Sequence, residues 1–399
     1  MKKTCGLDVH KDTIFCGVYN GETHNEVKEY STLTDSIRSM GKDLQSEDVE
    51  EVAIESTGIY WIPVWNILEE MGFKLILVNP YLIKQMPGRK SDVKDAQWIA
   101  TLLHKGLLRG SLVPSPTIRE LRSYSRKYMK LQHRQTSVLQ EMDRILIMCS
   151  IRITSFVGNI SAKSILNVVE QIIHGITDPE VLIDSIHGRI VNKHKREKIL
   201  QSLTGYITPH HQFLLGQAFE EYQLVIRQIT SCLDMMQDIC NQDFKKQHEL
   251  LMTIPGVSNT SAMILIAETG ADMLAFENSS KFSGWIGLRP RNDESAGKYK
   301  STAITKGNKY LKSILVQIAW AASRTKGSYF KEKFTRLSIR KTRRKALIAI
   351  ARKIAVLMWS MLHYEQCYNP ARLIIYEPGK VDAKVKYHQR EIERLEKLL

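Results

Sequence analysis

The chain has 399 residues, of which 43% are hydrophobic and 25% charged, a composition typical of soluble proteins with two or three domains. Lys and Arg number 57 against 42 Asp and Glu, and this net charge of +15 favours a polyanionic partner, nucleic acid first. The longest apolar stretch, residues 346–362, contains Arg352 and Lys353, and no long apolar segment opens the chain. We therefore expect no membrane span, no signal peptide and a cytoplasmic, nucleoid-associated protein. Six scattered cysteines without a Cys-x-x-Cys pair indicate neither a disulfide framework nor a zinc site.

Residues 1–115 are predicted to form an α/β domain. Strands are expected at residues 4–9, 14–19, 49–55 and 74–78, and helices at residues 34–44, 60–71 and 92–104. The first two strands read as a hairpin, and the later ones alternate with helices. This order favours a mixed sheet of the RNase H/RuvC kind over a purely parallel sheet.

Residues 116–247 are predicted to be an all-α domain with a coiled coil. Apolar residues recur at steps of three and four from Leu121 to Cys149, and again from Phe219 to Cys240. Two long helices joined by a returning segment indicate an antiparallel hairpin, although two helices of an ordinary bundle would show the same pattern. An exposed seam would also recruit a second copy, so we expect at least a dimer.

Residues 248–365 are predicted to form a compact, mostly helical domain, and residues 366–399 a separate tail. Pro255 and Gly256 indicate a turn within a helix-hairpin-helix-like element, where a glycine lets backbone amides approach a phosphate. A plain helix–helix turn is an equally good interpretation. Between Arg289 and Lys312 lie seven basic residues and two acidic ones.

Four carboxylates of the first domain are candidate metal ligands. Asp8 lies within the first strand and Glu55 ends the third, where a buried acid is costly unless a cation holds it. Asp92 and Asp95 project from one face of a first helical turn, where such residues often only complement the helix dipole. Together they would supply oxygen ligands for Mg²⁺ (or Mn²⁺) acting on phosphodiesters. An actin-like ATPase also begins with a strand Asp, but it needs phosphate loops and a second sheet, which the sequence lacks.

Ser295 is a candidate nucleophile because Ala296 and Gly297 beside it add little bulk, although most loop serines only make turn hydrogen bonds. Nearby arginines and a metal would activate it in place of a histidine base. Residues 324–353 contain twelve Lys and Arg and one acid, which indicates a helix surface along a phosphate backbone rather than a merely solvated face. The candidate nucleic-acid-binding residues are Arg289, Arg291, Lys298, Lys300, Arg340, Arg343, Arg344 and Lys345.

Six sequence blocks resemble the DEDD-type insertion-sequence transposases with a RuvC-like N-terminal domain and a serine-bearing C-terminal transposase domain. The blocks are GLDVHKDT, IESTGIYW, SDVKDAQWIATLL, IPGV, FSGWIGLRPRNDESAGK and TKGNKYLKSILVQIAWAA, and the resemblance as a whole covers the chain from Gly6 to about Trp359. Carried over residue by residue, the resemblance implies an acidic quartet, a Mg²⁺ (or Mn²⁺) site and a serine nucleophile. These residues are Asp8, Glu55, Asp92, Asp95 and Ser295, with Ser301, Ser279 and Ser280 as neighbouring serines.

The resemblance further implies excision and insertion of a circularised mobile element through a phosphoserine intermediate. It implies a structured noncoding RNA, encoded by the element, that pairs with donor and target DNA. Strand exchange needs at least two cut strands held together, so we expect a homo-oligomer, a dimer that becomes a tetramer on DNA. The competing hypothesis is a RuvC-like Holliday-junction endonuclease that uses metal-activated water and never joins DNA covalently.

Overall fold

The computed structural model describes residues 2–56, 58–79, 92–108, 110–291, 293–295, 298–301, 303–373, 389–390 and 392–396. The chain divides into two compact units, Met1–Pro114 and Ser115–Leu399. We describe each unit by itself. The finer division of the second unit after residues 247 and 365 stays a prediction.

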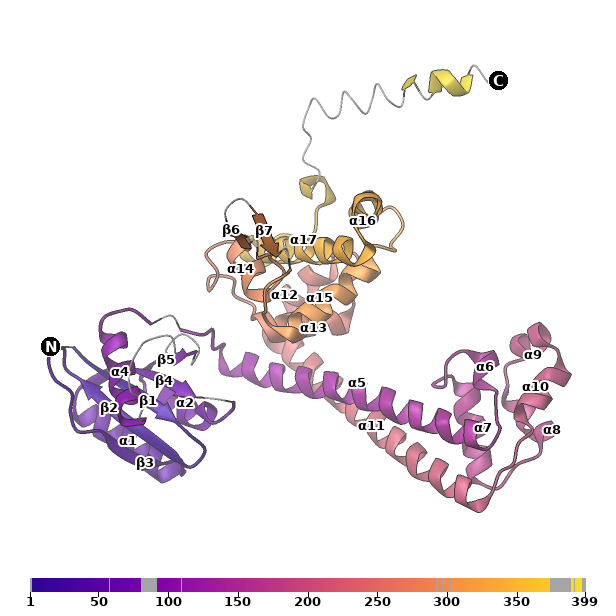
Figure 1. Ribbon diagram of the computed structural model, residues 1–399, viewed down its shortest axis with the longest axis horizontal. Helices are drawn as coiled ribbons and strands as arrows, with labels where there is room; N and C mark the ends of the chain where they lie inside the picture. Colours follow the sequence, from indigo (N-terminus) through magenta and orange to yellow (C-terminus); the bar gives the residue numbers. More distant parts are fainter. Residues whose placement is uncertain are drawn as a thin grey trace. The chain divides into compact units, whose positions relative to one another are not determined.

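The first unit contains a mixed five-stranded sheet (Figure 1). Its strands run in the order β3 (Lys28–Ser31), β2 (Thr13–Tyr19), β1 (Lys3–Val9), β4 (Val49–Ser56) and β5 (Lys74–Val78). β2 is antiparallel to both β3 and β1, whereas β4 and β5 run parallel to β1. This topology confirms the predicted mixed sheet. The sequence analysis missed β3, because a four-residue edge strand with two charged residues carries no apolar run.

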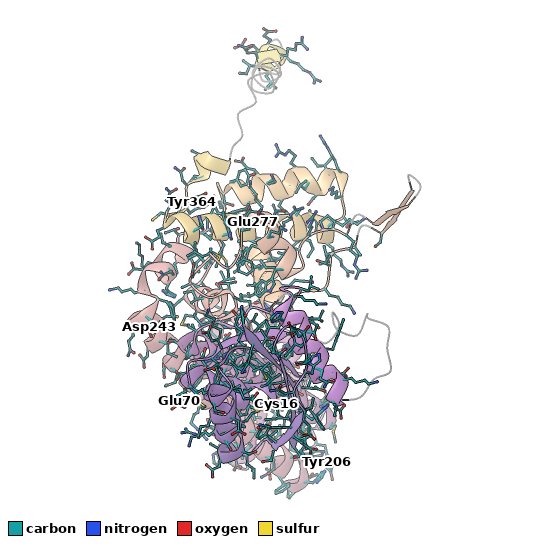
Figure 2. All side chains as sticks on the ribbon, turned by 90° about the vertical axis from the view of Figure 1, so that its left-hand side faces the viewer. Cys16, Glu70, Tyr206, Asp243, Glu277 and Tyr364 are labelled. Atoms are coloured by element: carbon teal, nitrogen blue, oxygen red, sulfur yellow. The ribbon has the colours of Figure 1, made fainter. Side chains whose placement is uncertain are left out.

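Helices cover both faces of this sheet. Alternate residues of β1, such as Cys5 and Leu7, pack with α1 (Thr34–Ser46) and α2 (Trp61–Glu70) in one core that also contains Cys16, labelled in Figure 2. The other face of β1 meets α4 (Asp92–His104). A strand's side chains alternate between faces, so Thr4, Gly6 and Asp8 all lie on the α4 side.

Gly6 sets how closely α4 approaches the sheet. A Cβ atom there would lie 2.3 Å from the carbonyl oxygen of Ala96, so only glycine fits. The Thr4 hydroxyl donates a hydrogen bond to the carbonyl oxygen of Ala100, 3.0 Å away. Thr4 therefore meets Ala100 and Gly6 meets Ala96, which means that β1 and α4 run in opposite directions. The same antiparallel alignment places the first turn of α4 beside the carboxyl end of β1.

The second unit contains a long helical hairpin. Helices α5 (Pro116–Met148) and α11 (Pro209–Asp243) pack along each other (Figure 1). Their direction is antiparallel, because Met142 shares a core with Leu215 and Leu131 shares one with Ile229. This confirms the predicted hairpin. Its far end is closed by the short elements α6 (Thr154–Val157), α7 (Lys163–Ile173), α8 (Pro179–Leu182), η1 (Ile183–Ser185), α9 (Gly188–His194) and α10 (Arg196–Leu203).

The apolar seam of α11 differs from the predicted one. Ala218 and Val225 are buried, whereas Phe219 and Ile226, which the heptad pattern selected, are only partly buried. A straight helix has 3.6 residues per turn, so a strict 3.5-residue repeat drifts off the contact line. Because α5 covers this seam within the chain, the seam gives no argument for a second copy, and the dimer stays a prediction.

The remaining helices form the C-terminal part of the second unit. They are α12 (Lys245–Met252), α13 (Asn259–Thr269), α14 (Ser279–Ile286), α15 (Lys309–Ala322), α16 (Tyr329–Arg340), α17 (Arg343–Tyr364) and the short η2 (Pro370–Leu373). Between α14 and α15 the chain forms an antiparallel pair of strands, β6 (Asp293–Ser295) and β7 (Lys298–Ser301). Figure 2 shows this hairpin projecting from the helices of its unit.

The turn between α12 and α13 confirms two helices joined by a hairpin, and its glycine packs closely against α15. Gly256 has φ +89, and a Cβ atom there would lie 2.6 Å from the backbone nitrogen of Ala322 in α15. Glycine is therefore required at this position for packing against α15, and the phosphate approach at Gly256 stays a prediction.

Within the described residues, α17 is the one helix long and apolar enough to cross a membrane, and half of its most apolar window is buried inside the protein. Ile350, Ile354 and Met358 are fully buried, and α17 packs against α14, α15 and α16. A core helix of this kind passes the same length and hydropathy test, so the finding is weak evidence for a membrane span.

A buried ion pair connects α5, α13 and the start of α15. The Glu268 carboxylate has no solvent exposure and accepts two hydrogen bonds from the Arg126 guanidinium, at 2.8 and 3.0 Å. It also accepts one from the Asn308 side-chain amide at 2.5 Å, while the Asn308 carbonyl caps α15 at Tyr310 and Leu311. Arg122 donates to the backbone carbonyls of Ala267 and Glu268. Residues far apart in sequence are thereby fixed to one another.

Candidate active site and nucleic-acid interface

Asp8 and Glu55 lie next to each other on neighbouring strands. They are register partners in the parallel pair of β1 and β4, and paired residues of adjacent strands point to the same face. Ala53, two residues before Glu55, packs against Ile99 of α4. Both carboxylate-bearing residues therefore stand on the α4 side of the sheet, at the carboxyl ends of their strands.

The first turn of α4 supplies two further acids. Asp92 and Asp95 are its first and fourth residues, so they share one helical face. The carboxylates of Asp8 and Asp92 and the imidazole of His10 each offer a ligand atom, and these three atoms lie within 4.8 Å of one another. The structure thus brings Asp8 and Asp92 together, as the sequence predicted, with Asp95 and Glu55 adjoining them.

The surroundings of Asp8 disfavour the ionised form of its carboxyl group. Only 8% of the residue is exposed, and this burial is the largest cause that raises its pKa. His10 opposes the shift, while the negative charges of Asp92 and Asp95 raise the pKa further. A divalent cation would offset both the lost hydration and the repulsion among carboxylates. The donor atoms that the structure brings together, from two carboxylates and one imidazole, therefore fit a divalent metal ion.

His10 was missed by the sequence analysis. Its Nε2 atom lies 3.3 Å from Asp8 Oδ2 and 3.8 Å from Asp92 Oδ1, so the imidazole bridges the two carboxylates. The signal was present in the sequence: Asp8 and His10 stand two residues apart at a strand end, a spacing that directs both side chains to one face.

Ser295 is the last residue of β6, and its backbone pairs with Lys298 of β7. The serine therefore ends a strand, and residues 296–297 between the strands lie outside the described residues, as do the side chains of Ser295, Lys298 and Lys300. At the base of this hairpin, Arg291 donates a backbone hydrogen bond to Ala303, and Thr305 donates one to Arg289. Both arginine side chains are exposed.

Basic side chains gather where α16 meets α17. Arg340 ends α16, and Arg343, Arg344 and Lys345 occupy the first turn of α17. All four are exposed, and none has an ion-pair partner among the described residues. Cations at a helix N-terminus are repelled by the helix dipole, so a bound polyanion would relieve this arrangement. The placement supports their predicted role in binding nucleic acid.

We expect changing Arg343, Arg344 and Lys345 to Ala to weaken DNA binding and flatten its salt dependence. Three fewer phosphate contacts should reduce the slope of log K against log salt by roughly 2.7 on duplex DNA, because fewer counterions are released. Binding titrations across a salt series measure this slope. The control changes Lys163, Lys193 and Lys198 to Ala, which removes the same charge elsewhere in the second unit. A slope unchanged from wild type would remove the start of α17 from the interface.

Comparisons with known proteins agree on one family. A family model described as "Transposase", of the DEDD type, matches residues 5–149, and the "Transposase IS116/IS110/IS902 family" model matches residues 248–335. A family 20 transposase of Pseudomonas aeruginosa is 24% identical over 326 residues, which cover 80% of this chain and 86% of that protein. A transposase of Sinorhizobium fredii is 31% identical over 130 residues, 30% of this chain and 32% of that protein.

Among solved structures, Thermus thermophilus RuvC in complex with a Holliday junction substrate matches 28% of this chain and 100% of its own, at 16% identity and a TM-score of 0.23. The two family matches lie on the blocks that hold the acidic cluster and the β6–β7 hairpin, in the order expected of one protein. The acidic residues gathered on a mixed sheet, the two matches and the transposase relatives lead to one conclusion: the chain belongs to the IS110-type family of DEDD transposases.

Proposed function

We propose that this transposase cuts and rejoins the DNA strands of its own insertion element through a serine ester, with the acidic cluster holding the metal. The observation that carries the proposal is the convergence of Asp8, Glu55, Asp92 and Asp95 at one end of one sheet face. Burial and the neighbouring acids disfavour the ionised Asp8 carboxyl group, and metal-assisted phosphodiester chemistry gives such a group a use.

The four acids would hold Mg²⁺ (or Mn²⁺), two from strand ends and two from a helix start. When bound, the metal supplies neutralisation of charge that develops on the oxygens around a scissile phosphate. Asp8 is rigidly placed by the strand on both sides of it, and Gly6 fixes the distance to the helix that bears Asp92. His10 holds the Asp8 and Asp92 carboxylates in position by bridging them.

Ser295 is proposed as the nucleophile. Its hydroxyl oxygen would form a bond to phosphorus as the bond from phosphorus to the leaving deoxyribose oxygen breaks. The serine proton leaves as the attack proceeds, and the departing oxygen takes up a proton. The resulting phosphoserine ester conserves the bond energy, so a hydroxyl of a second strand can displace the serine without an external energy source. Hydrolysis by water would lose that energy.

The proposed partners are the element's DNA ends, the target DNA and a structured noncoding RNA that pairs with both. The net charge of +15 and the exposed basic residues at the start of α17 support polyanion binding. Exchange between two cut strands also requires two active sites, so we propose a dimer in solution and a tetramer on DNA. The chemistry would take place in the cytoplasm, on the nucleoid.

The test of the proposal is a covalent adduct. With element DNA and Mg²⁺, the wild-type protein should give a protein–DNA species that survives denaturing gel electrophoresis, and Ser295→Ala should give none. Ser301→Ala is the matched control, because Ser301 ends the other strand of the hairpin and should leave the adduct unchanged. If the adduct is lost only in Ser301→Ala, Ser301 and not Ser295 is the nucleophile. Cleavage without any adduct in wild type would favour a nuclease that uses water.

A further inference from the structure

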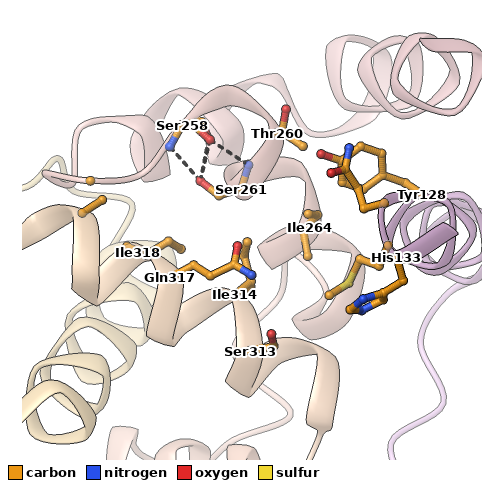
Figure 3. A pocket seen from close by; sticks show the side chains of 14 residues that line it. Tyr128, His133, Ser258, Thr260, Ser261, Ile264, Ser313, Ile314, Gln317 and Ile318 are labelled. Carbon is orange, nitrogen blue, oxygen red and sulfur yellow. Dashed lines mark hydrogen bonds between the residues drawn. The ribbon is translucent and has the colours of Figure 1, made fainter. Parts of the chain in front are cut away.

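A cavity of about 410 Å³, lined by both polar and apolar side chains, lies between α5, the start of α13 and α15 (Figure 3). This volume falls within the range of sites that bind small ligands. Figure 3 shows Tyr128 and His133 on one side, Thr260 on another, and the Gln317 side chain reaching toward the middle. All of these elements belong to the second unit.

The cavity presents hydrogen-bonding groups that the fold does not use. Within the described part of the chain, the side chains of Gln132, His133 and Gln317 have no hydrogen-bond or ion-pair partner. In contrast, Ser258 and Ser261 of the same cavity bond each other as the cap of α13. No residue that lines the cavity is acidic. Amide and imidazole groups are therefore available to a ligand that both donates and accepts hydrogen bonds.

A cluster of lysines adjoins this cavity. Lys306, Lys309 and Lys312 line a second hollow of about 610 Å³, which shares Ser313 and Gln317 with the first. The shared face of α15 comprises residues at steps of three and four, so the two hollows form one groove along the helix. From Lys309 to Gln317 the helix rises about 12 Å. The groove is cationic at one end and uncharged at the other, where amide, imidazole and hydroxyl groups stand among apolar side chains.

We propose that this groove binds one unpaired nucleotide of a nucleic-acid strand, with the phosphate at the lysines and the base in the cavity. Lysine ammonium groups suit a phosphate, side-chain amides suit the hydrogen-bonding edge of a base, and the Tyr128 ring offers a stacking face. A base inside a duplex cannot enter a cavity enclosed by three helices, so the nucleotide must be unstacked.

The groove lies next to the hairpin that bears the proposed nucleophile, which suggests why it would bind a nucleotide. Lys306 follows β7 by five residues, so the groove begins at the base of the hairpin that bears Ser295. Holding one nucleotide out of the stack there would keep the strand unpaired beside the proposed serine. The inference deepens the proposed function and rests on it for the presence of nucleic acid at this unit.

The first test measures binding of fluorescein-labelled oligonucleotides of one sequence to the full-length protein, as single-stranded RNA, single-stranded DNA and duplex DNA. Changing both Gln132 and Gln317 to Ala should raise the Kd for a single-stranded probe about tenfold and leave duplex binding unchanged. The slope against salt should stay the same, because no charge is lost. A loss with only one single-stranded probe assigns the groove to RNA or to DNA.

Gln140→Ala is the matched control, an exposed glutamine on α5 two turns beyond Gln132. Lys306 and Lys309 changed together to Ala should lower both the affinity and the salt slope, unlike the glutamine pair. The proposal is overturned if the glutamine pair leaves single-stranded binding unchanged, if duplex binding falls equally, or if Gln140→Ala has the same effect.

The second test locates the base directly. An oligonucleotide carrying one photoreactive thiopyrimidine, irradiated in complex with the protein, should crosslink to peptides that contain residues 128–133 or 313–317. Crosslinks that fall only elsewhere contradict the proposal. The readouts are independent of strand exchange: Ser295→Ala should crosslink like wild type, so an absent serine adduct and an absent base site would be distinguishable.

Discussion

Asp92→Asn is expected to reduce DNA cleavage by about a thousandfold while leaving the affinity for nucleic acid unchanged. The substitution keeps the size of the side chain but removes one anionic ligand beside Asp8, and a metal contributes several kcal/mol to the stabilisation of charge in such reactions. Cleavage of labelled element DNA under single-turnover conditions, together with binding titrations on the same protein, would measure both quantities. Asp8→Asn should behave in the same way.

Asp35→Asn is the matched control for this experiment. Asp35 is also an exposed aspartate in the first turn of a helix of the same unit, but it stands in α1, which covers the opposite face of the sheet. Its loss should leave cleavage at the wild-type level. Full wild-type cleavage in excess chelator would show that the acidic cluster does not act through a metal, whatever the effect of Asp92→Asn.

Glu268→Ala is expected to destabilise the second unit by about 3 kcal/mol, the lower end of the range for breaking a buried ion pair. The carboxylate is fully buried, and its loss leaves the Arg126 guanidinium and the Asn308 amide without their partner. The cost stays at the lower end because the Arg126 side chain is 41% exposed. Water can therefore hydrate part of its guanidinium group once the carboxylate has been removed. Urea unfolding followed by circular dichroism would measure the shift.

Glu220→Ala provides the comparison, since Glu220 is an exposed glutamate on α11. Its substitution should change the free energy of unfolding by no more than about 0.5 kcal/mol. Glu268→Gln should fall between the two, because it keeps the hydrogen bond to Asn308 possible while removing the charge that Arg126 needs. Equal shifts for Glu268→Ala and Glu220→Ala would contradict a structural role for the buried pair.

Much of the first unit could be predicted from the sequence. The strand and helix positions follow from local apolar periodicity, and α4 was predicted at its observed bounds, Asp92–His104. Asp8 stood out because an acid within a buried strand conflicts with its surroundings. β3 was missed because its four exposed or half-buried residues carry no such periodicity.

The sequence by itself predicted the mixed sheet, the helical hairpin, and that Asp8, Glu55, Asp92 and Asp95 stand on elements that a single sheet could bring together. Only the tertiary structure decided which groups meet. Arg126 and Glu268 are 142 residues apart in sequence and join through two hydrogen bonds, and Gly256 packs against the backbone of α15. The physical reason is that apolar periodicity indicates whether a side chain is buried away from water. The residue that it contacts once buried is set by packing between segments far apart in the chain, which a local sequence pattern does not encode.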